Sequence, residues 1–420
     1  MNRVVASLAV SLISASVVSL PALPVFTPDS AGIAHAQTAK AKAKAKAATK
    51  AATKAATKGA PKIAAKGPPP RIQYTADDAA AAIVPGFPDA RVWGDSLEDF
   101  QKVLPPNSGP WLAMSGGGAD GAFAAGLLNG WTQTGKRPDF TVVTGVSIGA
   151  LLAPYAFLGP KFDDELRNAI TTITGADIFE DRQTHESFLD TWPLRRLLEK
   201  RVSPELVAAV AAEHRKGRRL LVVTTNVDSG RRVVWDMGAI AQKGDEASVK
   251  LFRDVLLASS AIPGFFTPVL IDVEANGKKF QELHIDGSVT SPFFVAPEAA
   301  LEPGSKLRLP ATELYIVLNG RLANDFYPPE RTTVSILSRL ISVVLRSGLR
   351  AEAMLFAANS QRLGVPMFVA QVADGFTFPS YGLFDEKYMN ALYEHGVERA
   401  KNGTVFETLG LATEQRSGTP

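Results

Sequence analysis

Short apolar runs separated by helical segments constrain the fold of this chain most strongly. Four such runs, rich in β-branched and aromatic residues, are Trp111–Ser115, Phe140–Thr144, Leu220–Thr225 and Leu314–Leu318. Their length and composition predict strands covered on both faces, as in a parallel sheet. Helical segments, Ala122–Thr134 and Ile148–Leu158, follow the first two runs. The sequence therefore predicts an α/β fold with a mostly parallel sheet and helices on both faces.

A further helix is predicted over Thr332–Leu363. Four of its apolar residues fall near one face of the helix, namely Ile336, Leu340, Val343 and Val344. Packing against the core is the favoured interpretation of that face, and a lid that faces lipid is the alternative.

Residues 1–36 have the pattern of a secretory signal peptide. Arg3 precedes an apolar stretch from Val4 to about Phe26, and Ala34-His35-Ala36 offers small residues for cleavage before Gln37. An uncleaved membrane anchor is the alternative. No later stretch is apolar over a length that spans a bilayer. We therefore expect an exported protein, periplasmic or secreted, that has no transmembrane span when mature and contacts membranes only peripherally.

Residues 37–70 form a lysine- and alanine-rich segment that ends in three prolines. It holds nine lysines and no acidic residue up to Lys66, so it cannot bury a core and predicts a flexible spacer. A second interpretation is attraction to anionic lipid or another anionic polymer of the cell envelope. Nucleic acid is not an expected partner of an exported chain.

Charge and cysteine content limit the chemistry of the remaining chain. From Gly67 onward there are 35 basic and 41 acidic residues, a formal net charge of −6. The chain has no cysteine, which excludes disulfides, thiolate nucleophiles and zinc–thiolate sites.

The stretch Thr141–Ala150 predicts a strand, a sharp turn with serine at its apex, and a helix. Gly145 and Gly149 stand two residues to either side of Ser147, where so tight a turn leaves no room for side chains. The hydroxyl would then lie at a helix N-terminus, which stabilises developing negative charge. An ordinary glycine-rich turn is the alternative. We take Ser147 as the candidate nucleophile and the two glycines as its elbow.

Gly116, Gly117 and Gly118 follow the first predicted strand. Glycines allow several backbone N–H groups to converge, so this loop is a candidate oxyanion hole. Together with Gly121 the loop also matches the G-x-G-x-x-G pattern of dinucleotide-binding folds. The acidic residue which that pattern requires would be Asp139, before rather than after the second strand. Two successive glycine turns favour acyl transfer over NAD binding.

A serine nucleophile also needs a base. The order Ser147, Asp286, His395 is that of an α/β-hydrolase triad, while a carboxylate acting directly on the serine is the other arrangement. Asp286-Gly287 and Asp374-Gly375 both follow predicted strands and have similar local context. The residues alone do not choose between these two aspartates.

Three blocks together resemble the patatin-like phospholipases, and two more stretches are similar to the same family. In chain order they are Gly116–Gly121, Gly145–Gly149, Thr224–Gly230, Ala258–Pro268 and Asp286–Ser288. The resemblance implies a patatin-like three-layer architecture and one hydrolase domain over residues 71–420. Its motif core would be about 110–295, with a C-terminal extension over 314–420.

The resemblance also implies a serine carboxylic-ester hydrolase acting on lipid at a membrane surface, without metal or organic cofactor. It assigns the nucleophile to Ser147 and the base to Asp286, with no histidine, and the oxyanion hole to Gly116–Gly118. The family usually has Arg or Lys at the position of Asp120, and Gly or Ala at that of Ser288. Asp120 therefore puts a preference for anionic phosphate headgroups in doubt. A histidine-dependent esterase and a non-catalytic envelope-binding protein are the alternative functions.

Overall fold

Five parallel strands run through the centre of the structure, a computed structural model that describes residues 67–323, 326, 328–380 and 382–408. In spatial order these strands are β4 (Arg219–Asn226), β3 (Val142–Val146), β2 (Gly109–Met114), β8 (Ala311–Leu318) and β9 (Met367–Gln371). Four of them are the apolar runs that the sequence predicts as strands, and β9 is the strand predicted before Asp374. The predicted signal peptide and the lysine-rich segment up to Lys66 lie outside the described residues.

Antiparallel strands complete the sheet at its edges. They are β5 (Arg231–Asp236) and β1 (Arg91–Trp93) beyond β4, β10 (Glu407–Thr408) beyond β9, and the hairpin of β6 (Val269–Ala275) with β7 (Lys278–Asp286). Within the described part of the chain, all these strands join one ten-stranded sheet. The α/β fold with a mostly parallel central sheet is thus confirmed, and the antiparallel edges are additions that the sequence did not predict.

Alternate residues of the central strands pack into two separate apolar layers. In β2, Leu112 and Met114 belong to one layer, while Trp111 and Ala113 belong to the other. Side chains of successive strand residues point to opposite faces, so a strand that is apolar throughout must be covered on both sides. The continuous apolar runs in the sequence have this physical cause.

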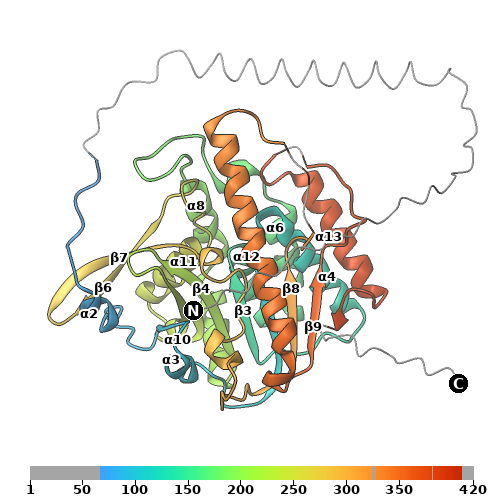
Figure 1. Ribbon diagram of the computed structural model, residues 1–420, viewed down its shortest axis with the longest axis horizontal. Coiled ribbons are helices and arrows are strands. Elements are labelled where there is room, and N and C mark those ends of the chain that lie inside the picture. The colour runs from blue at the N-terminus through green and yellow to red at the C-terminus, as the bar shows by residue number, and fades with distance from the viewer. Residues whose placement is uncertain (1–66, 324–325, 327, 381, 409–420) are drawn as a thin grey trace, which may run out of the picture. The chain divides into compact units, whose positions relative to one another are not determined.

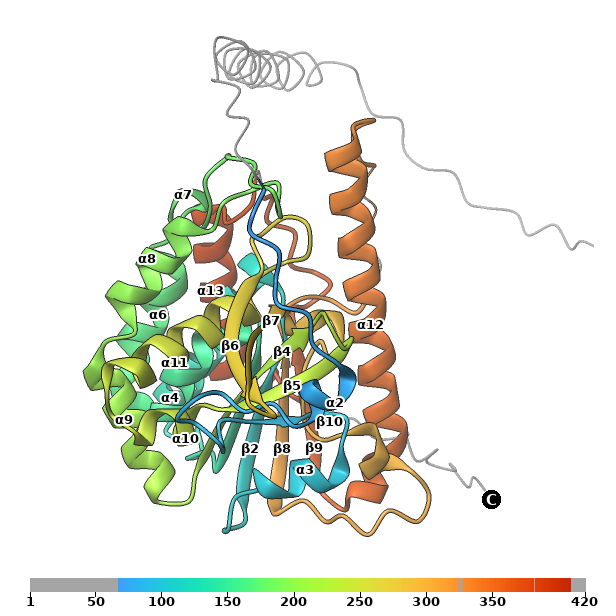
Figure 2. The same cartoon turned by 90° about the vertical axis from the view of Figure 1, so that its left-hand side faces the viewer.

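Most helices cover one face of the sheet, and α12 and α3 cover the other, as the edge view in Figure 2 shows. The second face holds α3 (Leu97–Lys102) and α12 (Thr333–Leu363). The remaining helices are α2 (Ala76–Ala80), α4 (Gly121–Gln133), α5 (Ile148–Leu158), α6 (Asp163–Thr171), α7 (Gly175–Ile178), α8 (Trp192–Arg201), α9 (Pro204–Arg215), α10 (Met237–Gln242), α11 (Glu246–Ser259) and α13 (Glu386–Lys401). Figure 1 shows the same elements from the side on which α12 covers the sheet. Among the described residues, no helix combines the length and the apolar composition needed to cross a membrane.

The predicted helix over Thr332–Leu363 is present as α12, but its orientation differs from the favoured interpretation. Its buried face carries Leu349, Ala353 and Phe356. The side chains expected to pack in the core are instead exposed, at 52% for Ile336, 55% for Leu340, 47% for Val343 and 59% for Val344. Core packing is therefore wrong for these four residues. Apolar residues occur around most of this helix, so periodicity alone does not identify the face that packs.

Candidate active site

Ser147 lies at the junction between β3 and α5. Its backbone has φ 55° and ψ −124°, a conformation that is strained for any residue with a side chain. A Cβ atom at Gly145 would lie 2.5 Å from the carbonyl oxygen of Gly149, and one at Gly149 would lie 2.5 Å from that of Met114. The sharp turn can therefore form only with glycine at both flanking positions.

Strand register brings Asp286 to the end of β3. In β4, Val223 pairs with Val146, the last residue of β3, on the parallel side. The next residue, Thr224, pairs with Asp286 at the end of β7. β7 therefore takes the place beside β4 where β3 ends and the chain turns at Ser147. Two residues that are 139 positions apart in the sequence thus come together.

The carboxyl group of Asp286 is buried, and the side chains of Ser147 and Ser288 lie close enough to lower its pKa. Its Oδ1 also accepts the backbone N–H of Ser288 at 2.8 Å. Burial raises the pKa of Asp286 to about 6, and the hydrogen bonds from the two serines partly oppose that rise. A carboxylate with this pKa is ionised at neutral pH and still basic enough to accept a proton.

The glycine loop packs directly against these residues. A Cβ atom at Gly116 would lie 3.2 Å from Cβ of Ser147 and 2.3 Å from Oγ of Ser288. Gly117 and Gly118 begin the 3₁₀ turn Gly118–Asp120, which leads straight into α4. The first N–H groups of a helix lack intrahelical acceptors and favour negative charge. The loop thus presents a helix start to the space beside Ser147.

One expectation for this loop needs correction. The N–H of Gly116 donates to the carbonyl oxygen of Pro292 at 3.0 Å, so it already has an acceptor within the protein. The N–H groups of Gly117 and Gly118 are therefore the better candidates for holding an oxyanion. The sequence could not show this because Pro292 lies far along the chain and reaches Gly116 only through the fold.

Comparison with known proteins agrees with this geometry. Residues 112–298 match the family model described as patatin-like phospholipase. These residues form a patatin-like phospholipase domain. The resemblance expected from the five sequence blocks is thereby confirmed, and Ser147, the glycine loop and Asp286 all lie inside the matched range.

Two further comparisons add little. No curated protein is significantly similar to the chain in sequence. The crystal structure of VipD from Legionella pneumophila is similar at 13% sequence identity and a TM-score of 0.34, over 72% of this chain and 68% of that chain. A TM-score this low carries no weight for function.

Two positioning residues escaped the sequence analysis. Oγ of Ser259 accepts the N–H of Ser147 at 3.0 Å and donates to the carbonyl oxygen of Val223 at 2.7 Å. Asn319, directly after β8, binds Ser115 through its backbone N–H (2.8 Å) and its side-chain amide (2.7 Å). Asn319 follows a strand next to β2 at the carboxyl edge of the sheet, where functional residues gather, and that position was a usable signal.

The unusual Asp120 of the glycine loop is held by a tyrosine. Tyr388, on α13, donates its hydroxyl to Oδ1 of Asp120 at 2.6 Å. Burial and the Asp120 charge raise the pKa of Tyr388, while the charges of Arg321 and Arg346 lower it. Arg321 and Arg346 therefore act electrostatically on the tyrosine that binds Asp120.

The remaining candidate bases lie elsewhere. His395, on α13, contacts the rings of Phe123 and Phe376, and among the described residues its Nε2 has no hydrogen-bond partner. His284 is buried and binds Thr224 and Glu282. Asp374 is exposed and follows β9, three strand positions from β3, or about 14 Å at usual strand spacing.

Metal and cofactor sites can be considered only for the described residues. Among them no group of three or more His, Asp or Glu side chains is arranged to hold a metal ion. Gly116 of the glycine loop is packed on Ser147 and Ser288, and Gly117 on Asn319. The geometry of this loop therefore suits acyl chemistry better than dinucleotide binding.

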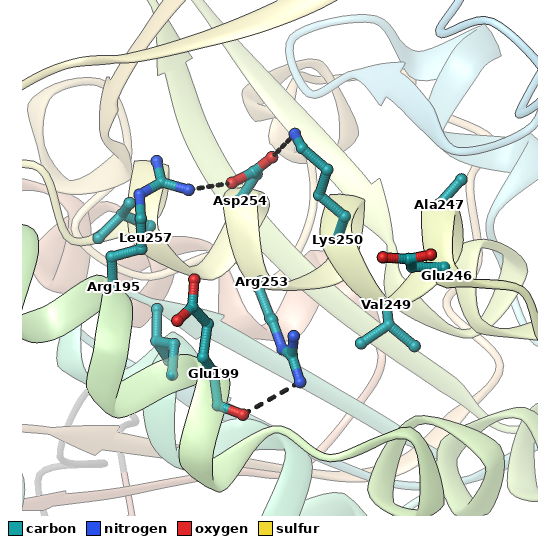
Figure 3. Close-up of a pocket in the computed structure, with 10 residues that line it drawn as sticks. Arg195, Glu199, Glu246, Ala247, Val249, Lys250, Arg253, Asp254 and Leu257 are labelled. Atoms are coloured by element: carbon teal, nitrogen blue, oxygen red, sulfur yellow. Dashed lines mark hydrogen bonds and ion pairs between the residues drawn. The ribbon is translucent and has the colours of Figure 1, made fainter.

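A cavity of about 510 Å³ lies between α8 and α11 (Figure 3), away from Ser147 and Asp286. Its charged side chains bind each other: Asp254 accepts from Arg195 at 2.9 Å and from Lys250 at 2.5 Å. Arg253 donates to backbone carbonyls of Glu199 and Val202. The cavity is a cleft between ion-paired helices and takes no part in the site.

Proposed function

We propose that this protein is a lipid acyl hydrolase that cleaves carboxylic ester bonds of phospholipids or related lipids. The patatin-like domain supports membership in a lipid-hydrolase family. The finer assignment is carried by one observation: strand register brings the buried Asp286 to the turn at Ser147, where the serine side chain is close enough to lower the pKa of the carboxyl group. In this proposal Ser147 is the nucleophile and Asp286 the general base.

Acylation begins when the ionised Asp286 accepts the proton of the Ser147 hydroxyl. Oγ of Ser147 then attacks the ester carbonyl carbon, and the carbonyl oxygen becomes an oxyanion. The N–H groups of Gly117 and Gly118 stabilise that charge, which is absent in the ground state. As the intermediate collapses, Asp286 returns its proton to the leaving alcohol, and the acyl group stays on Ser147.

Deacylation repeats these steps with water. Asp286, again ionised, accepts a proton from a water molecule that attacks the acyl-enzyme carbonyl. The same N–H groups hold the second oxyanion. Asp286 then protonates Oγ of Ser147, the C–O bond breaks, and the fatty acid leaves.

Phosphate headgroups remain compatible with the site despite Asp120. The carboxylate of Asp120 accepts a hydrogen bond from Tyr388, and Arg321 and Arg346 are close enough to act on Tyr388 electrostatically. These contacts offset the negative charge that the sequence alone places beside the glycine loop. We therefore keep phospholipids within the proposed substrate class.

The test compares the wild type with Ser147→Ala, Asp286→Asn and His395→Gln on a short-chain acyl ester and on phospholipid vesicles. We expect the first two changes to lower kcat by at least about 10³-fold, as loss of a nucleophile or base does, and His395→Gln to stay within about threefold. Fluorophosphonate labelling of the wild type but not of Ser147→Ala should accompany this result. Full turnover by Ser147→Ala, or loss of turnover in His395→Gln alone, would refute the dyad, and absence of both labelling and turnover would indicate a binding protein.

We also propose that the protein is exported, with residues 1–36 removed as a signal peptide. The supporting pattern is the charged start, the apolar stretch and Ala34-His35-Ala36. The lysine-rich segment that follows is proposed as a spacer that can attract anionic envelope polymers or lipid. N-terminal sequencing of the secreted or periplasmic protein should begin at Gln37, and a chain that keeps Met1 would contradict cleavage.

A further inference from the structure

The outward face of α12 carries an uncharged stripe that is apolar except at Ser347. We define the α12 stripe by its exposed residues, which follow helical spacing: Ile336, Leu340, Val343, Val344, Ser347, Ala351 and Met354. Exposure reaches 59% at Val344 and 64% at Met354. None of the seven is charged, and at 1.5 Å per residue the stripe is about 27 Å long. Contiguous apolar surface of this extent marks an interaction site.

The charges beside the stripe favour an anionic lipid surface as its partner. Arg339, Arg346 and Arg350 recur seven and four residues apart along one edge of the helix. Arg350 donates to the backbone carbonyl of Leu322. The acidic residue of α12, Glu352, lies on the packed side, where Ser291 contacts it at 3.3 Å. An apolar helix face bordered by arginines suits a bilayer rich in anionic lipid.

The same helix is connected to the candidate active site. A Cβ atom at Gly348 would lie 3.6 Å from Cγ of Pro292, and the carbonyl oxygen of Pro292 accepts the N–H of Gly116. The N-terminal half of α12 extends past the ends of the neighbouring strands (Figure 2). Ser147 follows one of these strands, at the edge of the sheet where the parallel strands end. A bilayer held against that half would therefore lie beside the site.

We propose that the α12 stripe is the surface by which this protein docks on an anionic lipid bilayer. The inference rests on the proposed function, since a lipid hydrolase must reach esters held in a membrane. The stripe supplies apolar contact with the acyl boundary, and the arginines supply attraction to headgroups. Val343 and Met354 lie on either side of Gly348 along α12, and Gly348 packs on Pro292, so the bilayer and the glycine loop lie on opposite sides of the same helix.

The experiment measures binding of the full chain to vesicles of ether-linked lipids, which contain no carboxylic ester. One set holds phosphatidylglycerol and phosphatidylcholine, and the other phosphatidylcholine alone. The stripe variant combines Ile336→Gln, Leu340→Gln and Val344→Gln. A control variant makes the same three types of change at exposed residues outside α12, Ile83→Gln, Val227→Gln and Leu270→Gln, which are 40 to 42% exposed.

We expect the wild type and the control variant to bind the anionic vesicles alike, within about twofold. The stripe variant should bind them about tenfold or more weakly, because three apolar side chains no longer enter the boundary region. Turnover of a soluble short-chain ester should be the same in all three proteins. Because the ether lipids are not substrates, this result stands or falls independently of hydrolysis.

Two outcomes would overturn the proposal. One is equal vesicle binding by the wild type and the stripe variant, including no binding by either. The other is a wild-type dimer in sedimentation analysis that the stripe variant dissociates while its vesicle binding is unchanged. That second outcome would assign the stripe to contact between two copies of the chain.

Discussion

The backbone N–H of Ser147 donates to Oγ of Ser259 at 3.0 Å, and the same hydroxyl donates to the carbonyl oxygen of Val223 at 2.7 Å. Ser259 is the last residue of α11 and is buried. One hydroxyl thus links the strained turn of the nucleophile to β4. A conformation with positive φ at a serine persists only when surrounding contacts hold it, and Ser259 is one of these contacts.

Replacement of Ser259 should therefore impair the chemical step. In Ser259→Ala the buried N–H of Ser147 loses its acceptor, at a cost of about 1–3 kcal/mol. We expect kcat to fall about tenfold while KM changes less than about twofold. Steady-state kinetics with a soluble ester measure both constants.

Its neighbour provides the control. Ser260 donates its hydroxyl to the carbonyl of Leu256 within α11, so Ser260→Ala should retain kcat. Ser259→Thr keeps a hydroxyl and should recover most of the activity. Equal losses in Ser259→Ala and Ser260→Ala would show a general effect on α11 rather than a role in positioning Ser147.

The acid limb of the pH–rate profile should report Asp286. Its pKa is about 6 because burial disfavours the charged form, so kcat/KM should fall as pH drops through about 6 and the carboxylate becomes protonated. The Ser288 hydroxyl lowers that pKa by hydrogen bonding. Ser288→Ala should move the acid limb upward by about half a pH unit. Ser291→Ala removes a nearby hydroxyl that bonds to Phe293 and Glu352 and should leave the limb unchanged; equal shifts in both variants would argue against the assignment.

Asp286 should reduce the stability of the folded protein at neutral pH. Its pKa is raised from 3.8 to about 6, so the folded state binds more protons than the unfolded state between these values. Stability contributed by this group is therefore lost as pH rises through that window. At pH 8 the free energy of unfolding of Asp286→Asn should exceed that of the wild type by up to about 3 kcal/mol, so the variant should melt at a higher temperature. Near pH 3.5 the two proteins should melt at the same temperature. A lower Tm of the inactive variant at pH 8 would contradict the predicted destabilisation by the charged Asp286.

The stability of the folded protein should also depend on pH through Glu352, which lies on the packed side of α12. Burial beneath the helix raises its pKa to about 8 from 4.5. The protonated form is favoured in the folded protein, so stability should fall as pH rises from about 5 to above 8. Glu352→Gln, which cannot ionise, should lose less stability than the wild type between pH 6 and pH 9, by a few kcal/mol. Thermal melts at both pH values measure the difference, and parallel behaviour of the two proteins would show that Glu352 is not buried as described.

Much of the central sheet was predictable because its strands obey local rules. β2, β3, β4 and β8 are continuous apolar runs, and such runs arise whenever both faces of a strand are covered. The turn at Ser147 could also be predicted, since only glycine at positions 145 and 149 leaves room for the backbone to pass. The sequence did not predict the antiparallel pairing of the edge strands or the face on which α12 packs. Both depend on surfaces supplied by distant parts of the chain.

By itself, the sequence determined the parallel strand pattern, the candidate nucleophile and the glycine loop, because each depends only on residues that are adjacent in the chain. It left Asp286 and Asp374 equivalent until the family resemblance was considered. The tertiary structure separates them by register: β7 pairs with β4 where β3 ends, which brings Asp286 against Ser147, while Asp374 follows β9 on the other side of β2 and β8. Only the fold decided that Ser259 holds Ser147, that Gly116 is committed to Pro292, and that the α12 stripe faces outward, since each relationship joins residues far apart in the chain.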